Sequence, residues 1–114
     1  MRIGVLGSGT MGAGIAQVAA TAGHEVILTD TSSDAIIKAR DGLLRILSRQ
    51  VEKGRMSDQE SKEIFGRIYF SESISAYEGC GMVVEAIIEN LEIKKKVFAQ
   101  LEEVVDDNCI LATN

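Results

Sequence analysis

Short apolar runs rich in β-branched residues alternate along this chain with longer segments in which apolar residues recur every three or four positions. The short runs predict five strands, at residues 2–6, 25–29, 68–71, 81–87 and 109–112. The longer segments predict four helices, at residues 10–22, from 31–34 through 53, from 57 onward, and around 93–104. This alternation is typical of βαβ units and predicts an α/β fold with a parallel sheet.

The first predicted helix has an unusually small face, which should let it lie close to the sheet. Its members are Gly12, Ala13, Gly14, Ala16, Ala19 and Ala20. Gly23 suits the position just after the helix, because glycine takes a left-handed conformation at little cost. The last predicted helix carries an apolar stripe, and Asn90 is its expected N-cap. The stripe consists of Ile93, Val97, Leu101 and Val104.

Two helices, rather than one, are predicted between the second and third strands. The first is amphipathic, and Gly54 ends it. Its apolar face is expected to contain Ile36, Ala39, Leu43, either Ile46 or Leu47, and either Gln50 or Val51. The segment Ser57-Asp58-Gln59-Glu60 has the form of a capping box and predicts the start of the second helix. We therefore expect an antiparallel helical pair inserted after strand two.

Right-handed crossovers between these elements predict a Rossmann-type doubly wound sheet with strand order 3-2-1-4-5. The 114 residues, 46% hydrophobic and 25% charged, are expected to form one domain. In such a sheet the ligand binds at the carboxyl ends of the strands, where the strand order reverses. We therefore expect a binding site between strands one and four.

Charge and cysteine content narrow the classes of function. A net charge of −5 with no face dense in Lys or Arg argues against binding to nucleic acid or to anionic membranes. The N-terminal apolar run is too short for a signal peptide or a membrane span, which favours a cytoplasmic protein. Cys80 and Cys109 have no metal-ligand spacing, so we expect two small buried hydrophobic residues and no metal site.

A glycine motif of the form G-x-G-x-x-G lies between the first strand and the first helix, and it predicts a dinucleotide site. Its residues are Gly7, Ser8, Gly9, Thr10, Met11 and Gly12. In this pattern Gly7 permits the tight turn, Gly9 lets the backbone approach a pyrophosphate, and Gly12 lets the helix contact the sheet. The helix N-terminus supplies N–H groups and a positive dipole end. The alternative is a glycine turn that binds no ligand.

Asp30 follows the second strand, eighteen positions after Gly12, where a carboxylate accepts a hydrogen bond from the adenosine 2′-hydroxyl. It would repel a 2′-phosphate by about 4 kcal/mol at 4 Å and an effective dielectric constant near 20. Residues 31–37 contain no Arg or Lys to reverse this, so the sequence favours NAD over NADP. Asp30 could instead be only an N-cap of the long helix, and the two roles can coexist.

Three stretches, residues 3–16, 83–90 and 110–114, resemble the 3-hydroxyacyl-CoA dehydrogenases, especially the bacterial 3-hydroxybutyryl-CoA members. The central stretch reads V-V-E-A-I-I-E-N and, with the helical pair, makes the resemblance specific. It implies that Glu89 and Lys94 contact the cofactor toward its ribose and nicotinamide end. It also extends the expected cofactor contacts to Ala86, Ile87 and Asn114.

The resemblance further implies an acyl-CoA substrate and places Lys53 at a position that the family uses against coenzyme A. Each lysine has a plainer interpretation. Lys94 could be a solvated helix lysine, and Lys53 a helix-end lysine that interacts with the helix dipole.

The resemblance also implies that the catalytic His–Glu pair and a helical second domain follow residue 114. The single histidine, His24, precedes the second strand, about 15 to 20 Å from the cofactor edge at 3.3 Å per residue. We expect it to be an exposed turn histidine. The 114-residue chain is therefore expected to be the inactive NAD-binding half of an enzyme that interconverts 3-hydroxyacyl-CoA and 3-oxoacyl-CoA.

Two other functions stay open at this point. The chain could be the cofactor domain of another hydroxyacid or sugar-acid dehydrogenase, or a stand-alone module that senses NAD without catalysis. We also expect an exposed apolar docking surface around strands four and five, through which the chain could form a homo-oligomer.

Overall fold

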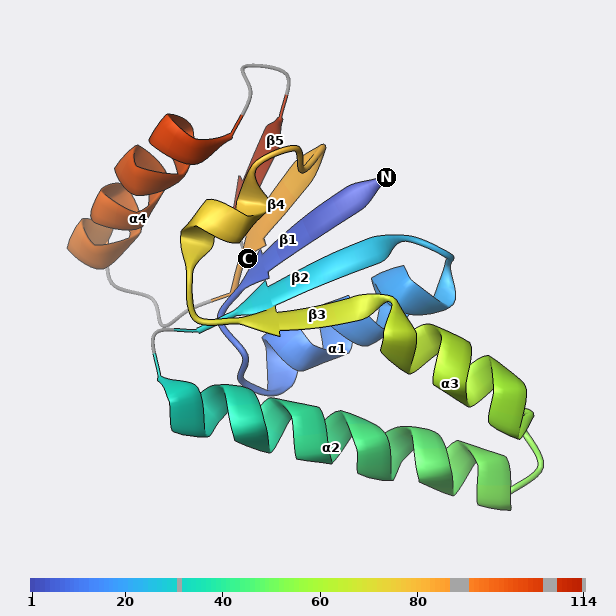
Figure 1. The fold of residues 1–114 in the computed structure, drawn as a ribbon. Coiled ribbons are helices and arrows are strands. Elements are labelled where there is room, and N and C mark those ends of the chain that lie inside the picture. Colours follow the sequence, from blue (N-terminus) through green and yellow to red (C-terminus); the bar gives the residue numbers. More distant parts are fainter. Residues whose placement is uncertain (31, 87–90, 106–108, 114) are drawn as a thin grey trace.

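The computed structural model describes residues 1–114 except residues 31, 87–90, 106–108 and 114 (Figure 1). The described strands are β1 (Arg2–Leu6), β2 (Glu25–Thr29), β3 (Ile68–Ser71), β4 (Met82–Glu85) and β5 (Ile110–Thr113). The α-helices are α1 (Thr10–Thr21), α2 (Ser33–Glu52), α3 (Asp58–Gly66) and α4 (Leu91–Val104), and a short 3₁₀ helix, η1, covers Ile74–Tyr77. The α/β fold and its order of elements are confirmed; η1 is an addition that the sequence pattern did not predict.

The five strands form one sheet in the order β3-β2-β1-β4-β5, and all neighbouring pairs are parallel. The predicted order 3-2-1-4-5 is therefore confirmed. Val5, in the central strand, pairs with Leu28 of β2 and with Val84 of β4. β2 lies on one side of β1, and β4, which comes later in the chain, lies on the other side. The strand order therefore reverses at the carboxyl end of β1.

Helices cover both faces of the sheet, with α1, α2 and α3 on one side and α4 on the other (Figure 1). On the first side, apolar strand residues such as Val5 and Leu28 pack against Ala16 and Ala20 of α1, which are fully buried. Gly14 is exposed, so its predicted place on the small face was wrong. At 100° per residue it lies about 200° around the helix from Gly12.

The predicted helical pair is confirmed, and α3 runs back along α2 (Figure 1). Of the two alternatives for the stripe of α2, Leu47 is buried, whereas Ile46 is 42% exposed. The side chain of Ser57 accepts a hydrogen bond from the Glu60 backbone N–H at 3.0 Å, as the capping-box pattern predicts.

On the opposite face, Tyr77 of η1 is fully buried and lies over Gly4 of β1. A Cβ atom on Gly4 would lie 2.6 Å from the tyrosine ring, so only glycine leaves room for it. The Tyr77 hydroxyl shares a hydrogen bond with the Thr29 hydroxyl at the end of β2. Burial raises the pKa of Tyr77 above its ordinary value, so the phenol stays protonated.

The two cysteines differ in burial. Cys80 is buried, as predicted, and its burial raises the thiol pKa to about 11. Cys109 is only partly buried, so its predicted burial was wrong. It lies just before the edge strand β5 and packs against the apolar cluster that contains Tyr77 and Cys80.

The last two strands differ slightly from their predicted bounds. β4 is shorter than residues 81–87, and β5 begins one residue later than predicted. The Ile110 N–H donates to the Gly81 carbonyl at 3.0 Å, where pairing of these two strands begins. The side chain of Ile110 is 53% exposed at the edge of the sheet. The apolar docking surface around β4 and β5, and self-association through it, stay predictions. The predicted N-cap of α4, Asn90, lies outside the described residues.

Candidate cofactor site

The three glycines of the motif have three separate reasons to be glycine. Gly7 has a φ of 106°, a conformation that other residues rarely adopt. A Cβ atom on Gly12 would overlap the carbonyl oxygen of Gly7 and lie 2.8 Å from its carbonyl carbon. A Cβ atom on Gly9 would meet no atom within 4 Å. The first and third glycines are thus needed by the fold, whereas Gly9 borders space outside the chain.

The loop is fixed to the neighbouring strand, and it opens directly into α1. The Gly7 N–H donates to the Thr29 carbonyl at 2.8 Å, and the Ala13 N–H donates to the Gly9 carbonyl at 2.9 Å. Gly9 is therefore the N-cap of α1, and it makes no side-chain capping bond. The first turn of α1 contains no acidic residue. The positive dipole end of α1 therefore lies at Gly9, beside the space that a Cβ atom on this residue would enter.

Asp30, directly after β2, lies against the glycine loop. Its Oδ2 accepts hydrogen bonds from the Ser8 backbone N–H at 3.0 Å and from the Ser8 hydroxyl at 2.9 Å. Its Oδ1 accepts from the Ser32 N–H at 3.1 Å. The carboxylate thus joins the loop before α1 to the loop before α2.

The alternative role of Asp30, as N-cap of the long helix, was wrong. The N-cap of α2 is Ser32, whose hydroxyl oxygen accepts a hydrogen bond from the Ala35 N–H at 3.3 Å. The hydrogen bonds from Ser8 to Asp30 were not predicted, because the two residues are 22 positions apart in the sequence.

The end of β4 lies beside the glycine loop. Leu6 pairs with Glu85, and the Ala86 N–H donates to the Leu6 carbonyl at 2.8 Å. Ala86 is therefore next to the loop at the point where the strand order reverses, and its contact with the cofactor stays a prediction. Glu85 is fully buried on β4.

The glycine loop, Asp30 and Ala86 lie together at the carboxyl edge of the sheet. Comparison with known proteins agrees with a nucleotide site at this edge. Residues 2–114 match the sequence model described as "3-hydroxyacyl-CoA dehydrogenase, NAD binding domain". The chain belongs to this family. Its fold and its glycine loop are accordingly those of an NAD-binding domain.

Individual relatives agree with the family. The chain is 42% identical over 112 residues to the 3-hydroxyadipyl-CoA dehydrogenase of Escherichia coli K12, covering 98% of this chain and 24% of that protein. It is 39% identical over 114 residues to a probable 3-hydroxybutyryl-CoA dehydrogenase of Deinococcus radiodurans, covering 100% of this chain and 41% of that protein. The chain therefore spans about a quarter to two-fifths of the length of these relatives.

Solved structures show the same relation. The crystal structure of 3-hydroxybutyryl-CoA dehydrogenase from Escherichia coli K12 has a TM-score of 0.97 at 41% identity, over all of this chain and 24% of the other. The corresponding enzyme structure from Ralstonia eutropha has a TM-score of 0.94 at 33% identity, over 99% of this chain and 40% of the other.

The remaining predicted contacts of this NAD-binding domain are only partly described. Thr10 and Met11 lie at the start of α1 with exposed side chains. Lys94 lies in the first turn of α4, and its side chain is outside the described part of the structure. Three further predicted contacts also lie outside it: Ile87, Glu89 and Asn114.

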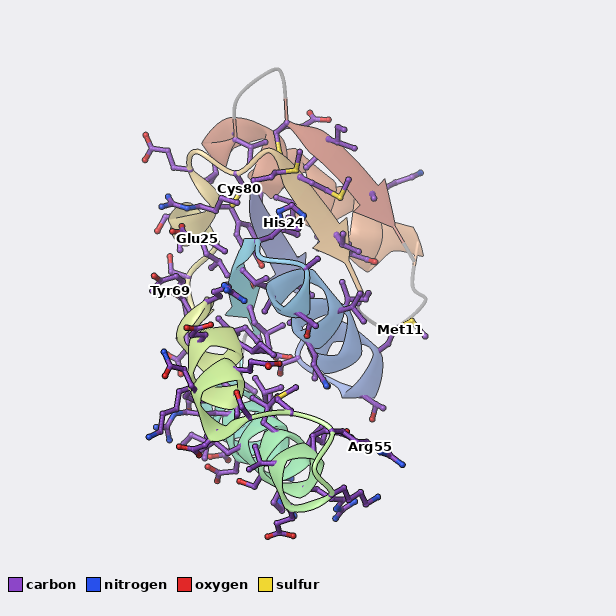
Figure 2. All side chains as sticks on the ribbon, turned by 90° about the vertical axis from the view of Figure 1, so that its right-hand side faces the viewer. Met11, His24, Glu25, Arg55, Tyr69 and Cys80 are labelled. Atoms are coloured by element: carbon purple, nitrogen blue, oxygen red, sulfur yellow. The ribbon has the colours of Figure 1, made fainter. Side chains whose placement is uncertain are left out.

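Lys53 and His24 lie away from the glycine loop. Lys53 is the exposed C-cap of α2, about 30 Å from the start of this 20-residue helix at 1.5 Å per residue. His24 precedes β2 at the amino edge of the sheet, and Figure 2 places it and Met11 at opposite ends of α1. Its Nδ1 lies 3.3 Å from the N-terminal amino group of Met1. His24 is half-buried, so its predicted exposure was wrong.

The described residues also bear on metal binding and on membrane insertion. No group of three or more His, Cys, Asp or Glu side chains among them could hold a metal ion. No helix among them is long and apolar enough to cross a membrane.

Proposed function

We propose that this NAD-binding domain is the cofactor half of an oxidoreductase that interconverts 3-hydroxyacyl-CoA and 3-oxoacyl-CoA. The family match and the names of the relatives support this reaction class. Because those relatives are about two and a half to four times longer than this chain, the complete reaction is a property of the longer protein.

The observation that carries the proposal is the open space over Gly9, at a helix start whose N-cap residue makes no side-chain hydrogen bond. A pyrophosphate needs N–H donors, a positive dipole end and close approach to the backbone, and this part of the chain offers all three. We assign the pyrophosphate to the loop from Gly7 to Gly12. The partly buried hydrogen bonds between Ser8 and Asp30 lie in the same loop and suit the adenosine ribose.

Asp30 is assigned to the ribose hydroxyls, and it makes the domain selective for NAD. A carboxylate accepts hydrogen bonds from hydroxyl groups but repels a phosphate. Ser8 and Ser32 donate to this carboxylate, and neither brings a positive charge that would favour a 2′-phosphate. We further assign the nicotinamide end of the cofactor to residues that follow β4 and β5: Ala86, Ile87, Glu89, Lys94 and Asn114.

The glycine loop and Asp30 would hold NAD, which would supply the hydride acceptor for C3 of the hydroxyacyl substrate. The same reaction needs a base within about 3 Å of the 3-hydroxyl proton. His24 lies at the opposite edge of the sheet and cannot reach that position. We therefore propose that the polypeptide of residues 1–114 binds NAD without oxidising substrate, and that Lys53 contacts coenzyme A in the complete enzyme.

Titration of the purified domain with NADH and NADPH, followed by cofactor fluorescence, tests the cofactor assignment. We expect NADH to bind at least about tenfold more tightly, a difference of about 1.4 kcal/mol. Asp30→Ala should reduce this preference, mainly because NADPH then binds more tightly. Equal affinities for the parent domain, or tighter NADPH, would remove Asp30 from this role.

Turnover can be measured on the same material. Absorbance assays with acetoacetyl-CoA and NADH should show no reaction for the domain or for His24→Ala. Turnover that depends on His24 would place the active site elsewhere.

A further inference from the structure

The two cysteines of the chain pack in the same apolar cluster, on the η1 side of the sheet. Cys80 is only 3% exposed and belongs to the buried part of this cluster, together with Tyr77. Cys109 is partly buried and packs against it. Both side chains are thiols in this structure. The fold thus brings two sulfur atoms, from just before β4 and just before β5, to one place.

The pairing of β4 with β5 sets the separation of the two cysteines. Met82 pairs with Ile110, and the Ile110 N–H donates to the Gly81 carbonyl at 3.0 Å. One step back along both strands therefore puts Gly81 opposite Cys109, with Cys80 one residue further on. Neighbouring strands are about 4.8 Å apart and a residue advances about 3.3 Å, so the two Cα atoms are about 6 Å apart on the diagonal. Disulfides form at Cα separations of about 4.4 to 6.8 Å.

The electrostatics of Cys80 agree with this separation. Burial is the main cause that raises the pKa of Cys80 to about 11, and the nearby Cys109 thiol raises it further. The two thiols also differ in access to solvent. Cys80 is enclosed and stays protonated at neutral pH, whereas the partly buried Cys109 is the thiol that a dissolved oxidant can reach.

We propose that Cys80 and Cys109 are a redox modification site, at which a peroxide drives formation of an intramolecular disulfide between the starts of β4 and β5. Hydrogen peroxide transfers one oxygen atom to the Cys109 sulfur, its O–O bond breaks, and water leaves, which gives a sulfenic acid. The Cys80 sulfur then attacks the Cys109 sulfur. The S–S bond forms, the S–O bond breaks, and the hydroxyl group leaves with the Cys80 proton as a second water. A dithiol reductant returns two electrons and two protons and restores both thiols.

The place of this disulfide decides what it changes. β5 is the last strand of the sheet, and a bond between the two cysteines closes the part of the chain that contains α4 and holds β5 against β4. The Gly81 N–H donates to the carbonyl of Arg2, at the start of β1, so the bond lies at the amino edge of the sheet, where Figure 2 also shows Cys80 and His24. The glycine loop and Asp30 lie at the carboxyl edge. Oxidation should therefore stabilise the fold and leave cofactor binding unchanged.

The experiment treats the purified chain at low concentration with a small excess of hydrogen peroxide and then measures its intact mass, its titratable thiols and its thermal unfolding. We expect the parent to stay monomeric, to lose two hydrogen atoms and both thiols, and to recover both with dithiothreitol. Peptide mapping without reductant should show one link, between Cys80 and Cys109. The unfolding midpoint of the oxidised parent should rise by about 5 to 15 °C over that of the reduced parent. Cys80→Ala and Cys109→Ala are the matched controls, and peroxide should raise the midpoint of neither.

Three results would overturn the proposal. In the first, the oxidised parent keeps both thiols, or Cys109 takes up two oxygen atoms as a sulfinic acid in the parent as readily as in Cys80→Ala. In the second, a disulfide forms only between two chains, through Cys109. In the third, the internal disulfide forms but lowers the unfolding midpoint, which would show that the paired strands must distort to make it. None of these results depends on the proposed function, which the cofactor titrations test separately.

Discussion

The starts of α1 and α2 lie at the same edge of the sheet, after adjacent parallel strands, yet they are built in opposite ways. At α2, the Ser32 hydroxyl caps the helix and Asp34 adds a negative charge in the first turn. At α1, the N-cap is Gly9, without a side-chain capping bond and without an acidic residue in the first turn. The third helix with a described N-cap, α3, follows the pattern of α2, with Ser57 as cap and Asp58 and Glu60 behind it.

This difference separates the helix starts that serve the fold from the one to which we assign a ligand. A glycine in place of serine at an N-cap costs only a few tenths of a kcal/mol. A capping side chain at Gly9 would add atoms to the space that we assign to the pyrophosphate, and an acidic first turn would repel that group. On this assignment, the α1 start gives up a small amount of stability for a binding site.

Gly12→Ala should have the largest effect on stability of any change at the α1 start. The new Cβ atom would overlap the Gly7 carbonyl, and both partners are backbone, so the loop or the helix has to move. We expect a loss of about 3 kcal/mol or more in the free energy of unfolding, measured by urea denaturation. Gly14→Ala is the matched control, because its Cβ meets no atom within 4 Å. It should be neutral or stabilising by up to about 1 kcal/mol. Equal effects of the two substitutions would contradict the close contact at Gly12.

Ser32→Ala should have a smaller effect, confined to the fold. Removal of the α2 cap is expected to lower the free energy of unfolding by about 1 kcal/mol, while the NADH dissociation constant stays within about twofold of the parent value. Urea denaturation and fluorescence titration measure the two quantities. A large loss of NADH affinity would show that the α2 start also belongs to the binding site.

Much of the fold follows from the sequence because it depends on short-range patterns and on general rules of chain connection. Residues such as Leu43 and Leu47 are periodic, and the handedness of crossovers then limits the strand order. The glycine motif likewise predicts the turn between β1 and α1, where Gly7 has a positive φ and Gly12 leaves no room for a Cβ atom. Gly14 was wrongly predicted on the small face of α1, because the presence of small residues alone does not show which side of the helix each one occupies.

The contacts that were missed join residues far apart in the sequence. Ser8 and Asp30 are 22 positions apart, and a short polar side chain in a loop has many possible partners. The ring of Tyr77 packs on Gly4 and so joins η1 to β1. The pattern of apolar and polar residues does not predict this contact. A glycine inside an apolar strand was the available indication, since it often marks the close approach of another group.

The account depends most on the claim that the space over Gly9 belongs to the cofactor. Thermal unfolding of the parent, Gly9→Val and Gly14→Val, each with and without NAD, tests it directly. Without NAD, Gly9→Val should unfold close to the parent temperature, because its side chain enters open space. At a NAD concentration of about a hundred times the dissociation constant, the parent and Gly14→Val should each gain about 2.7 kcal/mol, whereas Gly9→Val should gain nothing. A Gly9→Val domain that NAD stabilises as much as it does the parent would show that the pyrophosphate binds elsewhere.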